Sequence, residues 1–180
     1  MRGLLMACVL ALLAGCSGPQ VRDYANAQPR LELADYFNGE MQAWGMFQNR
    51  SGEVVKRFHV AMTGTWQGDI GVLDERFTYS DGSTERRVWT LKKQADGSWR
   101  GTADDVVGEA VGHIAGNALH WRYKLRLKVD DSTYVVDFDD WMFLMDGQVM
   151  LNRARMSKWG FDLGQVTLSF YKPLAAAQVE

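Results

Sequence analysis

The sequence predicts an all-β protein, an antiparallel up-and-down meander that closes into a soluble barrel of 8–10 strands. Apolar and polar residues alternate with a period of two through most of residues 39–172, as they do in strands with one buried face. The pattern is clearest over residues 119–129, where odd positions are apolar and four of the five even positions are Arg or Lys. Asx-Gly turn signals separate the alternating segments at a fairly even spacing. Because so long a meander would leave two exposed edges, closure is the economical arrangement.

The composition suits one globular domain in the 180 residues. A hydrophobic content of 47% excludes wholesale disorder, and the three Pro against 18 Gly favour tight turns over a helical bundle. The charges nearly balance, with 20 Lys+Arg against 22 Asp+Glu, so there is no electrostatic reason to expect nucleic acid as a partner.

Residues 1–15 are predicted to be a lipoprotein signal peptide. Met1 and Arg2 give a positive start, and residues 4–13 form an apolar run that is too short to cross a bilayer of about 30 Å as a helix. The sequence LAGC over residues 13–16 resembles the lipobox of bacterial lipoproteins, which places the lipid-modified thiol at Cys16. The alternative is an ordinary signal peptide with an incidental cysteine.

Lipidation at Cys16 would make the membrane a partner through the acyl chains, because several acyl chains anchor a protein essentially permanently. Cys8 would leave with the signal peptide, so no free thiol would remain. Ser17 stands where an Asp favours retention in the inner membrane, so we expect the periplasmic face of the outer membrane. The polar residues 16–30 are predicted to form a flexible tether.

The rest of the chain is predicted to divide into a short helix, a barrel domain and a tail. Residues 31–37 are expected to form a short helix that plugs one end of the barrel, residues 31–173 to form the barrel domain, and residues 174–180 to form a tail. The turn signals between strands are at residues 49–52, 67–69, 81–82, 96–97, 116–117, 130–132 and 146–147. A transmembrane barrel is the competing architecture, since alternation alone also suits lipid-facing strands. The dense charges on the polar faces favour the soluble form.

Three charged residues are predicted to lie on the apolar, inward faces of strands: Glu75, Arg87 and Asp140. Burying a charge is costly unless it is paired, so these positions are informative. One interpretation is an internal ion-pair network that fixes the strand register. Another is a polar anchor in an apolar pocket, with Arg87 facing an anionic head group. A third is that these residues lie at edge positions or are assigned to the wrong face.

Glycine recurs every four residues at Gly108, Gly112 and Gly116. As a strand, this segment would have one face almost without side chains, so another group must fill the space beside it. Either a large side chain packs there, with Trp121 or Trp99 as the natural candidates, or a cavity lies alongside.

No motif predicts catalysis, and we expect no metal or cofactor. The adjacent acidic pairs at 104–105, 130–131 and 139–140 do not form two-carboxylate sites, because neighbours on a strand point to opposite faces. His113 and His120 have no third ligand nearby in sequence, which argues against zinc. Nucleophile-elbow, Walker and dinucleotide motifs are absent from the sequence.

Several stretches together carry a family resemblance. They are 37–39 (FNG), 43–45 (AWG), 73–77 (LDERF), 86–89 (RRVW), 101–108 (GTADDVVG), 117–123 (NALHWRY), 138–142 (FDDWM) and 152–160 (NRARMSKWG). They resemble an uncharacterised family of exported Gram-negative lipoproteins, a domain of unknown function without an assigned activity, so the resemblance supplies no catalytic residues to carry over. More loosely, the barrel resembles the lipocalin and calycin architecture, with Gly64-Thr65-Trp66 similar to the lipocalin Gly-x-Trp on the second expected strand. That lipocalin-like architecture implies hydrophobic ligands by analogy of fold.

These observations predict a lipoprotein whose barrel binds a hydrophobic or amphipathic small molecule. A packed barrel that serves as an envelope interaction or structural protein is the alternative. A third is an enzyme for lipid-like substrates, with Asp140 or Glu75 as acid or base. A void of about 300 Å³ or more, the lower end for ligand pockets, would favour binding. The residues expected to contact a ligand are Glu75, Arg87, Trp89, Gly112, Trp121, Tyr123 and Asp140.

Overall fold

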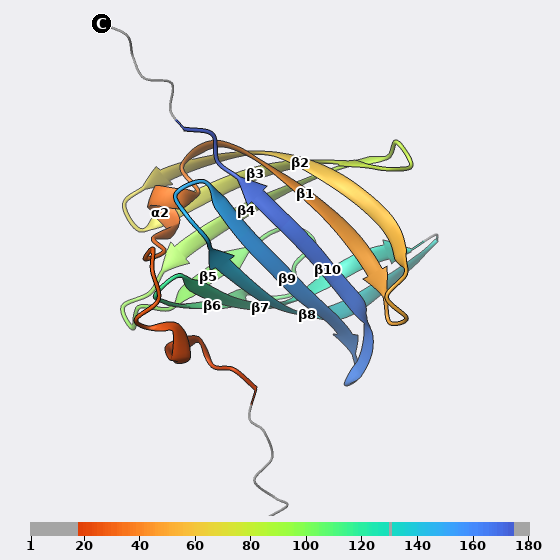
Figure 1. The fold of residues 1–180 in the computed structure, drawn as a ribbon. Coiled ribbons are helices and arrows are strands. Elements are labelled where there is room, and N and C mark those ends of the chain that lie inside the picture. Colours follow the sequence, from red (N-terminus) through yellow and green to blue (C-terminus); the bar gives the residue numbers. More distant parts are fainter. Residues whose placement is uncertain (1–17, 130, 175–180) are drawn as a thin grey trace, which may run out of the picture.

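Ten antiparallel strands follow one another along the chain and close into a barrel (Figure 1). The structure is a computed structural model that describes residues 18–129 and 131–174, so the predicted signal peptide and Cys16 lie outside the described residues. The strands are β1 (Gly39–Asn49), β2 (Val54–Gln67), β3 (Ile70–Tyr79), β4 (Thr84–Lys93), β5 (Trp99–Thr102), β6 (Ala110–Ala115), β7 (Ala118–Val129), β8 (Ser132–Leu144), β9 (Val149–Lys158) and β10 (Phe161–Tyr171). The predicted all-β, up-and-down fold is confirmed.

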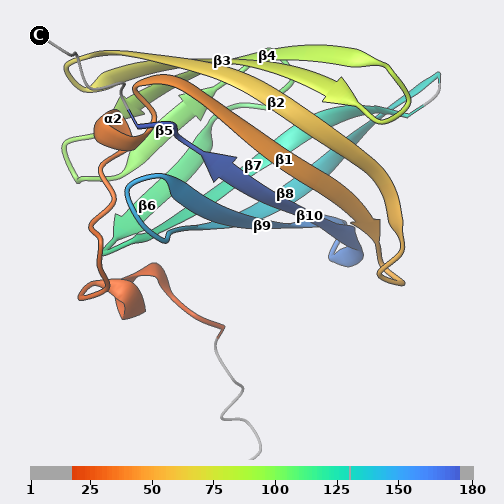
Figure 2. The ribbon, with the colours of Figure 1, turned by 45° about the horizontal axis from the view of Figure 1, so that its top comes forward.

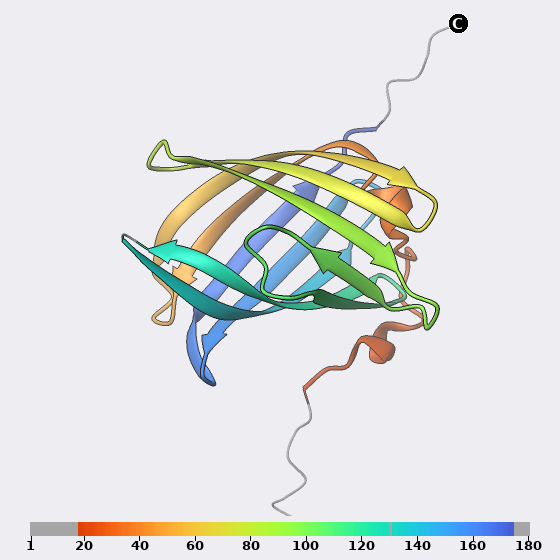
Figure 3. The ribbon, with the colours of Figure 1, turned by 180° about the vertical axis from the view of Figure 1, so that it is seen from behind.

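Closure occurs between the first and the last strand. β1 pairs with β10 from Gln42 opposite Tyr171 to Asn49 opposite Gly164, and every other strand pairs with its neighbours in sequence. This pairing removes the two free edges that an open meander would expose. β5 and β6 are the shortest strands, and a long loop joins them on the far side of the barrel (Figure 3).

The turns form where the Asx-Gly signals predict them. Asp81-Gly82-Ser83 and Asp96-Gly97-Ser98 make the same structure, in which the aspartate Oδ1 accepts the backbone N–H of the serine two residues later. The glycines have φ of +82° and +80°, a left-handed conformation that glycine adopts without a steric cost. Local chemistry therefore fixes these hairpins independently of the core.

The core fills the inside of the barrel, because the residues predicted to share apolar faces point inward. On β2, for example, Phe58, Val60 and Met62 are all buried, while Ala61 between them is exposed. On β7, Leu119, Trp121 and Leu125 are buried by the same alternation. Strand periodicity thus sorts the side chains into an interior and a surface.

A short helix closes one end of the barrel, as predicted. α2 (Leu33–Tyr36) has Leu33 and Tyr36 buried, and the Tyr36 hydroxyl donates to the Gln148 carbonyl in the β8–β9 turn at 3.0 Å. A hydrogen bond from Lys172 Nζ to the Asp35 carbonyl ties the helix to the end of the chain. Figures 1 and 2 show α2 at the barrel end opposite the β1–β2 and β9–β10 hairpins.

Part of the segment expected to be a flexible tether packs on the outside of the barrel. The 3-10 helix η1 (Val21–Tyr24) lies beside β6 (Figure 2). The Tyr24 ring meets the Phe143 ring edge-on, with centroids 5.1 Å apart, and Leu31 N–H bonds the Gly116 carbonyl at 2.8 Å. The chain therefore differs from the predicted flexible tether from Val21 onward, because the Tyr24 ring packs against aromatic side chains on the outside of the barrel.

Within residues 18–129 and 131–174, no helix combines the length and the apolar character that crossing a bilayer requires.

Candidate functional site

The barrel contains a cavity of about 160 Å³, below the roughly 300 Å³ lower end for ligand pockets. Its wall is mostly apolar and draws on α2 and on eight strands, β1–β4 and β7–β10. The polar residues among those lining it are Glu75, Tyr79, Glu85, Arg87, Tyr123, Asp140 and Asn152. All the predicted ligand contacts except Gly112 line this cavity. Because the exposed Glu85 is also a lining residue, the cavity reaches the surface beside the β3–β4 hairpin.

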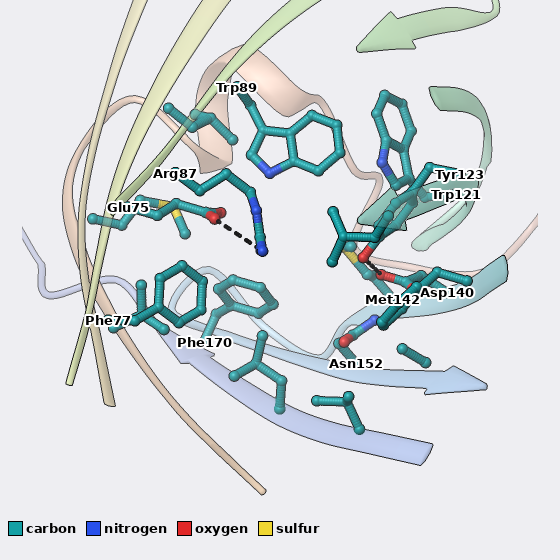
Figure 4. A pocket seen from close by; sticks show the side chains of 18 of the residues that line it. Glu75, Phe77, Arg87, Trp89, Trp121, Tyr123, Asp140, Met142, Asn152 and Phe170 are labelled. Carbon is teal, nitrogen blue, oxygen red and sulfur yellow. Dashed lines mark hydrogen bonds and ion pairs between the residues drawn. The ribbon is translucent and has the colours of Figure 1, made fainter. Parts of the chain in front are cut away.

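One side of the cavity carries an ion network, here named the Arg87 cluster (Glu75, Glu85, Arg87 and Asp105). Arg87 Nε and Nη2 lie 2.8 and 2.7 Å from Asp105 Oδ2, and Nη2 lies 3.3 Å from Glu85 Oε1. Arg87 Nη1 lies 4.0 Å from Glu75 Oε2 (Figure 4). β3 and β4 place Glu75 opposite Arg87 in register, which explains why both point inward. The interpretation as an internal ion-pair network therefore describes the actual contacts of Arg87.

Burial affects the two charges of this pair differently. Burial raises the pKa of Glu75 to about 7, although the nearby Arg87 guanidinium acts in the opposite direction. Burial also opposes the charge of Arg87, but the hydrogen bond and the charge of Asp105 and the charge of Glu75 outweigh it, so its pKa lies above the ordinary value. Arg87 thus stays charged, with Asp105 as its closest counter-ion.

The opposite side of the cavity carries a second polar group, here named the Asp140 pair (Tyr123 and Asp140). The Tyr123 hydroxyl donates to Asp140 Oδ2 across 3.4 Å, and β7 and β8 bring the two residues inward from adjacent strands (Figure 4). Asp140 is 5% exposed, and burial raises its pKa to about 8. Burial also raises the pKa of Tyr123 well above its usual value. Among the described residues, Asp140 Oδ1 has no hydrogen-bond partner.

Trp89 connects the two polar groups. It follows Arg87 on the inward face of β4, and its ring meets those of Trp121 and Tyr123 edge-on, with centroids 5.9 and 5.4 Å apart. Such tilted aromatic pairs are favoured by the charge distribution of the rings. The aromatic residues Trp89, Trp121 and Tyr123 therefore form a continuous wall between the Arg87 cluster and the Asp140 pair.

The predicted glycine face is only partly a strand, and it does not line a cavity. Gly108 lies in the β5–β6 loop and Gly116 in the β6–β7 turn, both with positive φ, so only Gly112 lies within β6. A Cβ on Gly112 would lie 2.1 Å from the Trp121 ring. The large-side-chain interpretation holds for Gly112, because Trp121 fills the space that the missing side chain leaves.

Sequence reasoning missed four polar residues of the site, and one of them, Tyr79 on β3, donates its hydroxyl to Glu85 Oε2 at 2.7 Å. Asp105, in the β5–β6 loop, is the closest partner of Arg87, and Glu85 extends the same network. Asn152 on β9 is buried beside Asp140 and donates to the Trp141 carbonyl at 3.3 Å (Figure 4). Asn152 shares an apolar face with Ala154 and Met156, and that periodicity would have placed it inside.

The acidic and histidine residues form no metal site in the part of the chain that the structure describes. His120 faces outward, where its Nε2 lies 3.0 Å from Asp139 Oδ1 and its ring stacks on Trp141. Asp139 and Asp140 point to opposite faces of β8, as the alternation predicts.

The cavity and its two polar groups occur in a chain that matches a known family over most of its length. The model of a family described as "Protein of unknown function (DUF3833)" matches residues 10–172. The chain belongs to this DUF3833 family. The predicted membership of an uncharacterised family is therefore confirmed, while the resemblance to exported lipoproteins and to lipocalins stays a prediction. No curated protein matches the chain.

The family match spans every element of the barrel from α2 to β10. Glu75, Arg87 and Asp140 of this DUF3833 protein all lie within it, and so does Asp105. The family is one of unknown function, so membership assigns no role to these residues.

Proposed function

We propose that this DUF3833 protein is a lipoprotein, anchored to the periplasmic face of the outer membrane, that binds a hydrophobic or amphipathic small molecule in its barrel. The proposal rests on the cavity, which remains between apolar side chains of α2 and eight strands and reaches the surface near Glu85. Protein interiors are otherwise close-packed, so an open space inside the barrel needs a reason, and ligand binding supplies one.

The cavity volume limits the size of the ligand. An apolar cavity of about 150 Å³ can hold benzene, so about 160 Å³ suits a single ring or a short chain rather than a large molecule. The ligand is therefore a small molecule, or a larger one of which only one end enters the barrel.

A cavity-filling substitution tests binding. Ala154 lies on the cavity wall and is 2% exposed, whereas Ala61 is exposed on the outer face of β2. We expect Ala154→Phe to weaken binding of benzyl alcohol, followed by calorimetry, at least tenfold, and Ala61→Phe to leave it unchanged. If Ala154→Phe does not fold, Ala154→Val makes a smaller change in the same direction. Equal affinities in folded variants and wild type would exclude the barrel as the binding site.

The anchor is tested separately. Mass spectrometry of the N-terminal peptide of membrane-purified protein should show acyl groups on Cys16, and Cys16→Ser should release the protein from the membrane fraction. A mature N-terminus without acyl groups would contradict the anchoring.

A second candidate, an envelope interaction protein, is favoured by an apolar row on the outer wall. Trp44, Leu151 and Phe143 line a shallow hollow of about 690 Å³, and strand pairing aligns them across β1, β10, β9 and β8. Trp44 is 50% and Leu151 44% exposed. Crosslinking through these positions in the envelope should then capture one protein at stoichiometric yield, which a pure small-molecule binder would not do.

A further inference from the structure

Asp140 is the unusual polar group of the cavity. Among the described residues, four buried side-chain atoms lack a hydrogen-bond partner: Trp66 Nε1, Asp105 Oδ1, Asn117 Oδ1 and Asp140 Oδ1. Of these four residues, only Asp140 lines the cavity. An unpaired buried polar atom is costly, and Asp140 is among the residues that line the cavity, so its carboxyl is suited to a ligand that donates to it.

The charges around the cavity indicate which donor is suited to that oxygen. Glu75, Glu85 and Asp140 line the cavity, and Asp105 stands behind Arg87, whereas Arg87 is the single basic residue among those lining it. Arg87 already contacts Glu75, Glu85 and Asp105. The site therefore holds four carboxyl groups for one cation, and Asp140 has no basic side chain in contact within the described residues.

The neighbours of Asp140 provide a place for the apolar part of a ligand. Trp121 lies directly across from Asp140 in the β7–β8 pairing, and Phe138 precedes Asp140 by two residues on the same inward face of β8. The Tyr123 and Phe138 rings stack with centroids 5.0 Å apart. Figure 4 shows the carboxyl of Asp140 at the edge of this aromatic group, across the cavity from Glu75.

We propose that the ligand is an apolar molecule with one protonated amine, which donates to Asp140 Oδ1 while its apolar part packs against the aromatic wall. This inference rests on the proposed function, because it names the chemical class of the molecule that the barrel binds. It also replaces the anionic head group predicted for Arg87, since the guanidinium is already occupied by carboxylates. An ammonium group would supply the counter-charge that Asp140 lacks.

The protonation of Asp140 gives this binding a pH dependence. The titratable and charged groups that act on Asp140 are Tyr123 on β7, Asp139 on β8, Arg87 on β4 and Glu75 on β3. Because burial raises the pKa of Asp140 to about 8, the free cavity holds a neutral carboxyl at neutral pH. An ammonium group replaces that proton, so amine affinity should rise between pH 6 and pH 8.

Three single-ring probes of similar size test the inference: benzylamine, benzyl alcohol and benzoate. Calorimetry would be performed on the full chain carrying Cys16→Ser, which removes the site of acylation. We expect benzylamine to bind at least tenfold more tightly than benzoate and more tightly than benzyl alcohol. Asp140→Asn should weaken benzylamine at least tenfold and change benzyl alcohol less than threefold, because only the amine needs the carboxylate.

Asp139→Asn is the matched control, since it removes the adjacent carboxylate on the outer face, and it should change each of the three affinities less than threefold. If Asp140→Asn does not fold, the order of the three probe affinities for the wild-type protein still tests the inference. Benzoate as the tightest probe, or equal affinities, would overturn the amine and leave barrel binding intact. Failure of all three probes to bind a folded protein would instead count against the proposed function itself.

Discussion

The Arg87 cluster and the Asp140 pair bury carboxyl groups in the same cavity wall, but only the Arg87 cluster contains a counter-charge. In the cluster, Arg87 has carboxylate oxygens at 2.7 and 3.3 Å. In the pair, the Asp140 side chain has one hydrogen bond within the described residues, from the Tyr123 hydroxyl at 3.4 Å. The pKa values of the two buried acids also differ, because burial raises the pKa of Glu75 to about 7 and that of Asp140 to about 8.

This difference assigns different roles to the two groups. A buried charge with partners from β3, β4 and the β5–β6 loop fixes how those segments meet, and removing one partner leaves the others uncompensated. A buried acid with an unpaired oxygen, such as Asp140, does little to fix how the strands meet. The strands around it hold it in place. We therefore expect changes in the Arg87 cluster to alter stability, and changes in the Asp140 pair to alter pH dependence and binding.

The largest effect is expected for Arg87→Leu. It leaves the buried Glu75 and the half-buried Asp105 without their cation, which should lower the free energy of unfolding by about 3 kcal/mol at pH 7, measured by urea denaturation. Arg86→Leu, on the exposed face of β4, is the control and should have a much smaller effect. Equal losses in the two variants would show that the Arg87 cluster does not act as a structural unit.

The next effect is a change in pH dependence for Asp140→Asn. The folded wild type holds the Asp140 proton up to about pH 8, whereas the ordinary pKa is 3.8, so its stability should fall as pH rises between these values. The variant lacks this titration. Its stability relative to wild type should therefore increase by roughly 3 kcal/mol between pH 5 and pH 8.

Urea denaturation at both pH values measures this difference, and Asp139→Asn is measured in parallel. An increase that both variants share would mean that it does not arise from the buried carboxyl. No change in Asp140→Asn would mean that Asp140 is already ionised in the folded protein at pH 5.

The inward positions of Glu75, Arg87 and Asp140 could be predicted because strand alternation is a local property of the sequence. Glu75 and Asp140 each lie between apolar residues two positions away, Arg87 lies two positions before Trp89, and the structure places all three on the cavity wall. The Asx-Gly turns could be predicted for the same reason, since aspartate and glycine specify the turn by themselves.

The partner of Arg87 could not be predicted, because Asp105 lies where the alternation stops. The loop at 103–109 includes only one isolated bridge, from Val106 to Leu125, and its side chains follow no period of two. The β9–β10 turn was missed for a related reason: Trp159 occupies it with φ of +52°, a conformation that residues other than Gly, Asn and Asp rarely adopt. The sequence also could not show whether Trp121 or a cavity lies beside Gly112, because that depends on side-chain packing between neighbouring strands.

A moderate effect is expected for Gly112→Ala, which acts on the Asp140 side of the barrel. The added methyl would lie 2.1 Å from the Trp121 ring, and Trp121 pairs with Asp140 across β7 and β8. Moving that ring should cost about 2 kcal/mol in urea denaturation. Gly82→Ala is unsuitable as a control because Gly82 has a positive φ, so Ala110→Gly, a buried change on the same strand, is compared instead. Unchanged near-UV circular dichroism in Gly112→Ala would contradict the close packing of Trp121.

The smallest effect is expected for Tyr123→Phe, which removes the side-chain hydrogen bond that Asp140 receives from Tyr123. The 3.4 Å separation is long, so we expect a loss of about 1 kcal/mol in the free energy of unfolding. The exposed Tyr134→Phe is the control. Because the hydroxyl stabilises the ionised carboxylate, its removal should raise the pKa of Asp140 further and shift the amine binding proposed above to higher pH. A shift to lower pH would mean that Tyr123 accepts a hydrogen bond from protonated Asp140 Oδ2, in which case the hydroxyl would stabilise the neutral acid rather than the carboxylate that an ammonium group needs.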